Sequence, residues 1–209
     1  MLRLETVEPH TFSVLNQLMK MPELQGFALV GGTALSLLYG HRMSIDLDLF
    51  SNKPFENTAV VDALQNKFGA SFDNRSTNPR FGIFCFVDEV KVDIVRHPHP
   101  IIRPELIIDG IRMFSTEDII AMKVQAILGR GKKKYFWDIA ELLKHYPIID
   151  FVNLHKEKYT TQNLYITVPY AVTYFADADE SEEPICLQNQ SWDDVKEFIS
   201  KKVREYVTQ

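Results

Sequence analysis

The residues best suited to chemistry in this chain are two aspartates separated by one residue, Asp46 and Asp48. They alternate with apolar residues over positions 45–50, so in a strand both carboxylates project from one face, roughly 7 Å apart. Like charges at that distance repel, and a bound cation relieves the repulsion. Carboxylates are also the ligands that Mg²⁺ prefers. The pattern therefore indicates a metal site, although an exposed edge strand with solvated acids fits the same alternation.

A glycine pair, Gly31-Gly32, precedes the two acids. It follows a short apolar run, 27–30, and opens a segment of helical character, 33–39, that ends at Gly40. Glycines let the backbone approach a phosphate closely, and the N–H groups and dipole at a helix N-terminus favour an anion. Many strand-to-helix turns use glycine for geometry alone, and this pair lacks the longer glycine patterns of known nucleotide-binding loops. The turn indicates phosphate binding only in combination with the acids.

A third carboxylate, Asp93, lies in the second of two apolar runs, 81–87 and 90–95. Asp88-Glu89 separates these runs, which predicts a hairpin with a two-residue turn. An acid inside an apolar strand needs a partner, and cations shared with the first two acids would supply it. The alternative is a salt bridge to Arg96 or a position at the edge of the sheet.

Cationic residues follow at several positions. Arg42, between the first glycine-capped helix and the acidic strand, can donate in a forked manner to a phosphate or to an aspartate. Lys123 lies in a helix that a capping-box pattern predicts to begin near residue 115, where its ammonium can reach a triphosphate or stay solvated like most lysines. Positions 130–134 carry four positive charges and attract phosphates, or form a solvated loop. Asp138 either orients this basic group or pairs with a lysine at helical spacing.

In their order along the chain these motifs resemble the AbiEii/AbiGii toxin family of nucleotidyltransferases, a branch of the polymerase-β-type superfamily. The resemblance covers about residues 27 to 143, and its specificity comes from the joint occurrence of four motifs. The matching residues are Gly31-Gly32-Thr33-Ala34-Leu35 with Tyr39, His41-Arg42, Ser44, Asp46 and Asp48; then Lys91-Val92-Asp93-Ile94-Val95; then Asp118-Ile119-Ile120-Ala121-Met122-Lys123; then Arg130-Gly131-Lys132-Lys133-Lys134 with Asp138-Ile139.

The resemblance implies an enzyme that moves a nucleotide from a nucleoside triphosphate to a hydroxyl of RNA (tRNA) or of a protein, with two Mg²⁺ ions about 4 Å apart. In this interpretation the metal ligands are Asp46, Asp48 and Asp93, and Asp93 also accepts the hydroxyl proton. Lys123 and Asp138 complete the predicted catalytic set. The predicted nucleotide contacts are Gly31, Gly32, Thr33, Arg42, Ser44 and Lys123. The resemblance also implies a toxin-like component of an abortive-infection or type IV toxin–antitoxin system, with a cognate antitoxin.

One position departs from the family pattern. The basic run of the fourth motif is usually followed by an aspartate, and here that position is Tyr135. If the missing acid is needed for catalysis, the chain is instead a catalytically impaired nucleotide-binding module. A structural protein without a ligand is a third, weaker interpretation.

Composition and sequence pattern predict the organisation of the chain. With 209 residues, 45% of them hydrophobic, it can bury a sizeable core, and its net charge of −5 argues against coating nucleic acid through bulk charge. Two distant cysteines, no signal peptide and no long apolar stretch indicate a cytoplasmic protein without a membrane segment. We expect a nucleotidyltransferase-type α/β domain over 1–112, with a mixed sheet and flanking helices, and a mainly helical domain over 113–209.

Four smaller expectations complete the prediction. Helices are expected over 11–21, 58–68 and 133–146. The polar segment 71–80 is expected to be a loop, and His97-Pro98-His99-Pro100 a turn. One run of aromatic residues in the C-terminal half is expected to pack between helices rather than to form a base-stacking platform; its members are Tyr159, Tyr165, Tyr170, Tyr174 and Phe175.

Overall fold

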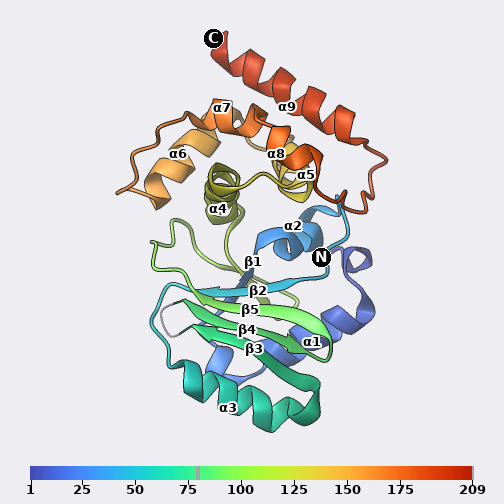
Figure 1. Ribbon diagram of the computed structural model, residues 1–209, viewed down its shortest axis with the longest axis vertical. Coiled ribbons are helices and arrows are strands. Elements are labelled where there is room, and N and C mark those ends of the chain that lie inside the picture. Colours follow the sequence, from blue (N-terminus) through green and yellow to red (C-terminus); the bar gives the residue numbers. More distant parts are fainter. Residues whose placement is uncertain (79–80, 209) are drawn as a thin grey trace.

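The computed structural model describes residues 1–78 and 81–208, and it consists of one mixed β-sheet with helices on both sides (Figure 1). The strand order across the sheet is β3-β4-β5-β2-β1-β7-β6. Two neighbouring pairs, β2–β5 and β1–β7, are parallel, and the others are antiparallel. The strands are β1 Ala28–Val30, β2 Leu47–Ser51, β3 Phe72–Asn78, β4 Gly82–Val87, β5 Val90–Arg96, β6 Leu106–Ile108 and β7 Ile111–Met113.

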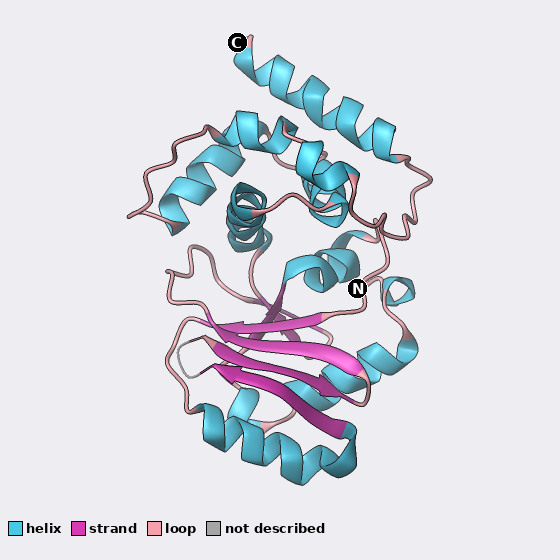
Figure 2. Cartoon of the chain, in the orientation of Figure 1, coloured by secondary structure: helices cyan, strands magenta, loops and turns pink. Residues whose placement is uncertain are grey.

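Helices lie on both sides of this sheet, as Figure 2 shows in cyan. Two of them, α1 and α3, lie on one side, and α2 and the C-terminal helices lie on the other (Figure 1). The predicted α/β fold is therefore confirmed. The α-helices are α1 Pro9–Met19, α2 Gly31–Tyr39, α3 Asn57–Phe68, α4 Thr116–Gly129, α5 Lys133–Leu142, α6 Ile148–Lys158, α7 Val168–Thr173, α8 Ala176–Asp179 and α9 Trp192–Val207. Short 3₁₀ helices occupy Leu4–Thr6, Pro22–Leu24 and Gly69–Ser71.

The elements that the sequence predicts around the site are confirmed. The strand β1 ends directly at the glycine pair, where α2 begins, and Gly40 closes that helix in the left-handed conformation. The strands β4 and β5 form the predicted hairpin, in which Asp88 and Glu89 have φ of 50° and 66°. Two successive positive φ values are the geometry of a two-residue turn that matches the twist of the strands.

Other boundaries differ from the prediction. The segment 71–80 is not a loop throughout, because β3 occupies Phe72–Asn78 and pairs with β4 at the edge of the sheet; residues 79–80 lie outside the described part. Polar side chains suit such an edge, so the composition that indicates a loop also fits this strand. The acidic strand begins at Leu47, which leaves Asp46 just before it. The helix expected over 133–146 ends at Leu142.

The C-terminal half is helical, as expected. No β-strand follows β7 in the part of this half that the structure describes, although Arg42 and Cys186 form an isolated bridge. The division into domains at residues 112 and 113 stays a prediction. Tyr159 is buried, as predicted, but the prediction of packing is wrong for three other tyrosines, whose exposed fractions are 104%, 58% and 47%; these are Tyr165, Tyr170 and Tyr174. Within residues 1–78 and 81–208 we find no helix whose length and apolar character would let it cross a bilayer.

Candidate active site

The acids of the first two motifs meet because β2 and β5 are parallel neighbours. Asp48 lies directly opposite Asp93 in their register, and Asp46 precedes β2 by one residue. Since side chains alternate along a strand, the side chains of Asp48 and Asp93 project from the same face. All three acids line one cleft of about 130 Å³. Its other lining residues are Gly32, Arg42, Ser44, Lys91, Lys123, Arg130, Lys134 and Tyr135.

The glycine pair makes room for two of these side chains. Gly31 has φ of +72°, and a Cβ added there would lie 2.6 Å from Oδ2 of Asp48. A Cβ at Gly32 would overlap the guanidinium of Arg42. Thus the turn admits a carboxylate and a guanidinium, and the prediction that it also contacts phosphate remains open.

Among the described residues, the carboxylates of Asp48 and Asp93 form one ion pair between them, that of Asp93 with Lys91. Burial, and after it the neighbouring Asp93 and Asp46, raise the pKa of Asp48 to about 6, against the lowering effect of Lys123 and Lys91. Asp93 accepts from Lys91 Nζ at 3.0 Å through Oδ2, whereas its buried Oδ1 has no hydrogen-bond partner among the described residues. A buried anionic oxygen without a partner is costly, so this pair favours an additional cation.

Asp46 is oriented differently from the other two acids. Its Oδ2 accepts from Lys134 Nζ of α5 at 3.2 Å. Over residues 1–78 and 81–208, no three side chains of His, Cys, Asp or Glu are grouped so that they could hold a metal ion as they stand. The structure therefore brings the predicted metal ligands into one cleft without assembling them into a metal centre.

Asp138 forms the most heavily paired group of the site. Its carboxylate is fully buried and lies 2.7 Å from Arg42 Nε, 2.5 Å from Lys123 Nζ and 2.8 Å from His41 Nε2. Burial alone would raise the pKa of Asp138, but Arg42, Lys123 and His41 together hold it well below its usual value. Because Arg42 and Lys123 line the cleft while Asp138 does not, this carboxylate fixes two cations at the wall of the cleft from behind.

Thr33 and Ser44 brace the loop that carries Asp46. The Thr33 hydroxyl is buried, donates to the carbonyl oxygen of Asp46, and lies 2.8 Å from the hydroxyl of Ser44. Ser44 lines the cleft and Thr33 does not. Their predicted contact with a nucleotide stays a prediction.

Tyr135 contacts two cations of the cleft. Lys123 Nζ lies 5.2 Å from the centroid of its ring, within range of a cation–π interaction. Its hydroxyl oxygen accepts from Arg130 Nη2 at 3.3 Å. At the position where the family usually has an acid, this chain holds its cations with a neutral ring and a hydroxyl.

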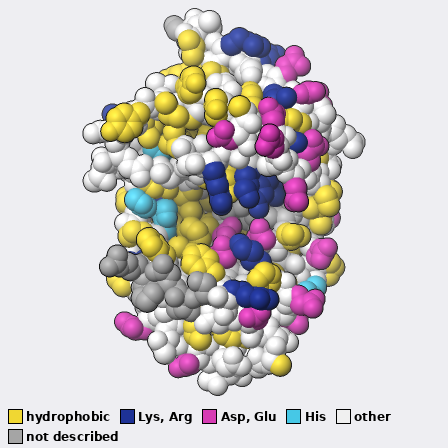
Figure 3. All heavy atoms as spheres, viewed as in Figure 1, with side chains coloured by type: hydrophobic (Ala, Val, Ile, Leu, Met, Phe, Trp, Pro, Cys, Tyr) yellow, Lys and Arg dark blue, Asp and Glu magenta, His cyan; other side chains and the backbone are white. Residues whose placement is uncertain are grey.

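Four residues that line the cleft are absent from the predicted set of site residues; they are Lys91, Arg130, Lys134 and Tyr135. Lys91 shares a strand face with Asp93, and this period-two spacing is the signal that places it in the cleft. Lys134 belongs to the basic run that the sequence makes visible, but its contact with Asp46, 88 positions away, has no local signal. Figure 3, which shows one face of the molecule, has basic and acidic side chains close together at the border of the central hollow.

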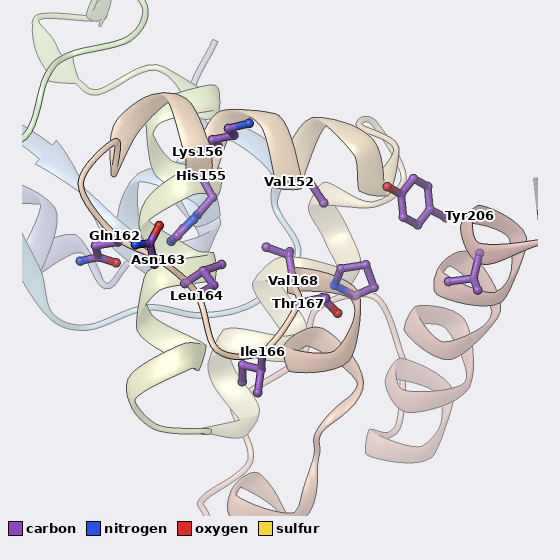
Figure 4. Close-up of a pocket in the computed structure, with 12 residues that line it drawn as sticks. Val152, His155, Lys156, Gln162, Asn163, Leu164, Ile166, Thr167, Val168 and Tyr206 are labelled. Atoms are coloured by element: carbon purple, nitrogen blue, oxygen red, sulfur yellow. The ribbon is translucent and has the colours of Figure 1, made fainter.

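A larger cavity of about 620 Å³ lies between α6, the segment after it and the end of α9. In Figure 4 Asn163 and Leu164 of that segment lie near His155 of α6, and Tyr206 of α9 lies at the opposite end. His155 Nε2 is 2.9 Å from Oε1 of Gln125. No carboxylate lines this cavity, so it does not offer the chemistry of the smaller cleft.

A mixed sheet that presents paired aspartates beside a glycine turn, opposite fixed cations, defines a nucleotidyltransferase. The family model described as "Nucleotidyl transferase AbiEii toxin, Type IV TA system" matches residues 13–202. This chain belongs to that family, as the four motifs predict.

Other proteins are similar to this chain in sequence or in fold. An uncharacterized protein of Aquifex aeolicus (strain VF5) is 34% identical over 191 residues, covering 87% of this chain and 88% of that protein. The solved structure of MenT4, a nucleotidyltransferase toxin of Mycobacterium tuberculosis H37Rv, superposes with a TM-score of 0.61 at 12% identity, covering 99% of this chain and 86% of that chain. JHP933 of Helicobacter pylori has a TM-score of 0.59 at 18% identity, covering 95% and 92%. At these identities the solved structures support the fold alone.

Proposed function

We propose that this protein transfers the nucleotidyl group of a nucleoside triphosphate to a hydroxyl of RNA, with tRNA as the first acceptor to test. The observation that carries the proposal is the register of β2 and β5, which aligns Asp48 with Asp93 in the cleft that Arg42 and Lys123 also line. RNA is favoured as the acceptor because Arg130 and Lys134 add positive charge to the same cleft.

The residues of the cleft divide into two roles. Arg42, Lys123 and Lys91 bind the phosphates and stabilise the charge that develops on the leaving pyrophosphate. The acceptor hydroxyl attacks the α-phosphorus, so that a new oxygen–phosphorus bond forms as the bond to pyrophosphate breaks. Asp93 accepts the proton of that hydroxyl. Asp138 touches none of the reacting groups in this scheme and acts by positioning Arg42 and Lys123.

Divalent cations fit the acids of this cleft. The donors are carboxylates, which suit Mg²⁺, and the unpartnered Oδ1 of Asp93 and the raised pKa of Asp48 both favour a cation at this place. Asp48 and Asp93 would hold two Mg²⁺ ions together with Asp46, once Asp46 leaves Lys134. Bound there, Mg²⁺ supplies charge neutralisation for the attacking and leaving oxygens.

Membership of a type IV toxin–antitoxin family implies a cognate antitoxin for this protein. In our proposal, transfer to RNA is the toxic activity that the antitoxin opposes. Expression of the wild-type protein without an antitoxin should therefore slow bacterial growth, and the variant that lacks transfer should not.

The test is transfer of label from each α-labelled nucleoside triphosphate to total RNA in the presence of Mg²⁺. We expect Asp48→Asn to lower transfer by about 100-fold or more, as loss of a preorganised charge at a reacting centre does. Asp193→Asn is the matched control, because the side chain of Asp193 is 89% exposed on α9. Label in added protein instead of RNA would identify a protein hydroxyl as the acceptor. Nucleotide binding with no transfer would favour the catalytically impaired module, and equal transfer by wild type and Asp48→Asn would contradict the proposal.

A further inference from the structure

The face of the sheet that carries the acids continues into an apolar, aromatic surface. In the register of β4 with β5, Phe84 lies opposite Asp93, and in the register of β2 with β5, Phe50 lies opposite Val95. Phe50 follows Asp48 by two residues, so the two side chains share a face about 7 Å apart along the strand. Phe50, Phe84 and Val95 are only partly buried, although large apolar side chains of the sheet core are fully buried.

His97 extends this surface beyond the end of β5. Its backbone N–H donates to the carbonyl of Ser51 at 2.8 Å, which keeps the residue beside the end of β2. Its ring lies 5.8 Å from that of Phe50 with an interplanar angle of 32°, and 6.1 Å from that of Tyr159. We call Phe50, Phe84, Val95 and His97 the aromatic face.

The imidazole of His97 is a neutral ring. Burial, the ammonium of Lys158 and the neighbouring His99 lower its pKa to about 3, against a smaller raising effect of Asp118. Its Nε2 is buried and has no hydrogen-bond partner in the described part of the chain. Ring contacts rather than a side-chain hydrogen bond from Nε2 hold the imidazole in place, and a neutral ring held in this way suits stacking.

One face of the molecule has a central hollow (Figure 3). Figure 3 shows hydrophobic side chains lining the central hollow, with acidic side chains at one border and histidine side chains at the opposite border. Along β2, Asp48 comes before Phe50, and the ring of His97 lies beside the ring of Phe50.

We propose that the aromatic face is the site for the heteroaromatic base of the nucleoside triphosphate, which stacks there while its phosphates lie at Asp48, Asp93 and the cations beside them. The proposal rests on the proposed function, since it assigns the other end of the same substrate. The ligand has a charged end and a flat apolar end joined by one sugar, and the cleft and the aromatic face have the same division into a charged part and an apolar part. An apolar acceptor group does not share this division, because it lacks the polyanionic end that the cations require.

The experiment compares ligands with and without a base. Calorimetry in Mg²⁺, without acceptor, gives dissociation constants for the four nucleoside triphosphates and for inorganic tripolyphosphate. We expect Phe50→Leu, which keeps an apolar side chain and removes the ring, to weaken binding of the preferred nucleotide about 10-fold, the usual effect of losing one base-stacking ring. Tripolyphosphate binding should stay unchanged.

Variants of His97 provide an independent test. His97→Leu should weaken nucleotide binding in the same selective way, and His97→Phe, which restores a neutral ring, should recover most of the affinity. Tyr165→Leu is the control, because Tyr165 is fully exposed outside the cleft. Melting temperatures establish that each variant is folded, and if Phe50→Leu does not fold, the His97 pair decides.

Three results would overturn the inference. The first is a wild-type protein that binds tripolyphosphate as tightly as every nucleoside triphosphate. The second is an equal loss of affinity for tripolyphosphate and for the nucleotide in the Phe50 and His97 variants. The third is that these variants keep the wild-type affinity for both ligands. Transfer of label to RNA is measured separately, so RNA labelling that persists beside any of these results leaves the proposed function standing. An absence of labelling with selective loss of base binding would contradict the proposed function alone.

Discussion

Asp138 illustrates how one buried carboxylate determines the arrangement of a site that it does not line. It binds Arg42, Lys123 and His41, which come from segments 15 to 97 positions away in the sequence. We expect Asp138→Asn to destabilise the fold by about 3–5 kcal/mol at pH 7, because it leaves two buried cations without their counter-ion. Urea unfolding measures this change, and a loss below about 1 kcal/mol would contradict it.

The pH dependence of this loss follows from the sign of the pKa shift. The folded-state pKa of Asp138 is well below the unfolded value of about 3.9, so its contribution is fully present above that value. It is lost as the pH falls through the folded pKa. The difference in melting temperature between wild type and Asp138→Asn should therefore be constant from pH 7 to about 5 and narrow only at the acid end. A difference that narrows near neutral pH would contradict this assignment.

The role of position 135 separates two interpretations of this protein, an active enzyme and an impaired nucleotide-binding module. Its ring and hydroxyl already contact Lys123 and Arg130, so we expect the position not to limit activity. Tyr135→Phe keeps the ring and should keep transfer within about threefold of wild type, since loss of one exposed hydrogen bond is a small effect. Tyr135→Asp adds a negative charge that faces the triphosphate and should weaken its binding. Steady-state kinetics separate these effects, and a gain of transfer in Tyr135→Asp would show instead that the missing acid is limiting.

At the scale of the elements, the sequence predicts what local chemistry determines. The turn at the glycine pair, the two-residue hairpin turn and the alternation of β5 each follow from a few adjacent residues, and all are confirmed. The three-residue strands β6 and β7 were not predicted, because β7 pairs with β1 across more than 80 positions and no local pattern marks it. The neutralisation of Arg42 and Lys123 by Asp138 is also non-local, so the sequence could identify these residues but could not determine their pairing.

The turn between β1 and α2 allows a matched test of an element. Gly31→Ala has two costs: an alanine at φ of +72° is strained by about 1–2 kcal/mol, and its Cβ would displace the carboxylate of Asp48. Gly110→Ala has the backbone cost alone, since Gly110 has φ of +81° and no neighbouring atoms within 4 Å. We expect Gly31→Ala to lose at least as much stability as Gly110→Ala, and only Gly31→Ala to lose transfer per folded molecule. Equal transfer by the two variants would show that the position of Asp48 does not depend on this turn.

At the scale of the whole molecule, the helices after β7 complete the site as well as cover it. One wall of the cleft comes from β2 and β5, and the other comes from Lys123 on α4 and Lys134 and Tyr135 on α5. The Asp138 cluster joins these helices to the segment before β2, and backbone hydrogen bonds join residues 41 and 43 to residues 185 and 187. The cleft therefore depends on contacts between parts of the chain that are far apart in sequence.

A second buried ion pair fixes the segment that carries His97. Lys158 of α6 donates to Asp118 of α4 at 2.6 Å and to the carbonyl of Pro100 at 2.8 Å, and both charged side chains are fully buried. Asp118 also accepts from the backbone N–H groups of residues 102 and 103. This pair thus joins α4, α6 and the segment between β5 and β6.

Because both charged side chains are buried, replacing one of them should lower the free energy of unfolding more than replacing both. We expect Lys158→Met to destabilise the protein by about 3–5 kcal/mol, and addition of Asp118→Asn to recover part of that loss, since no buried charge then remains unpaired. Lys156→Met on the exposed side of α6 is the control and should change stability by less than about 0.5 kcal/mol. Urea unfolding of the three variants measures the differences. A double variant less stable than Lys158→Met would mean that Asp118 holds the 100–103 segment mainly through its backbone hydrogen bonds, and that the ion pair with Lys158 contributes little.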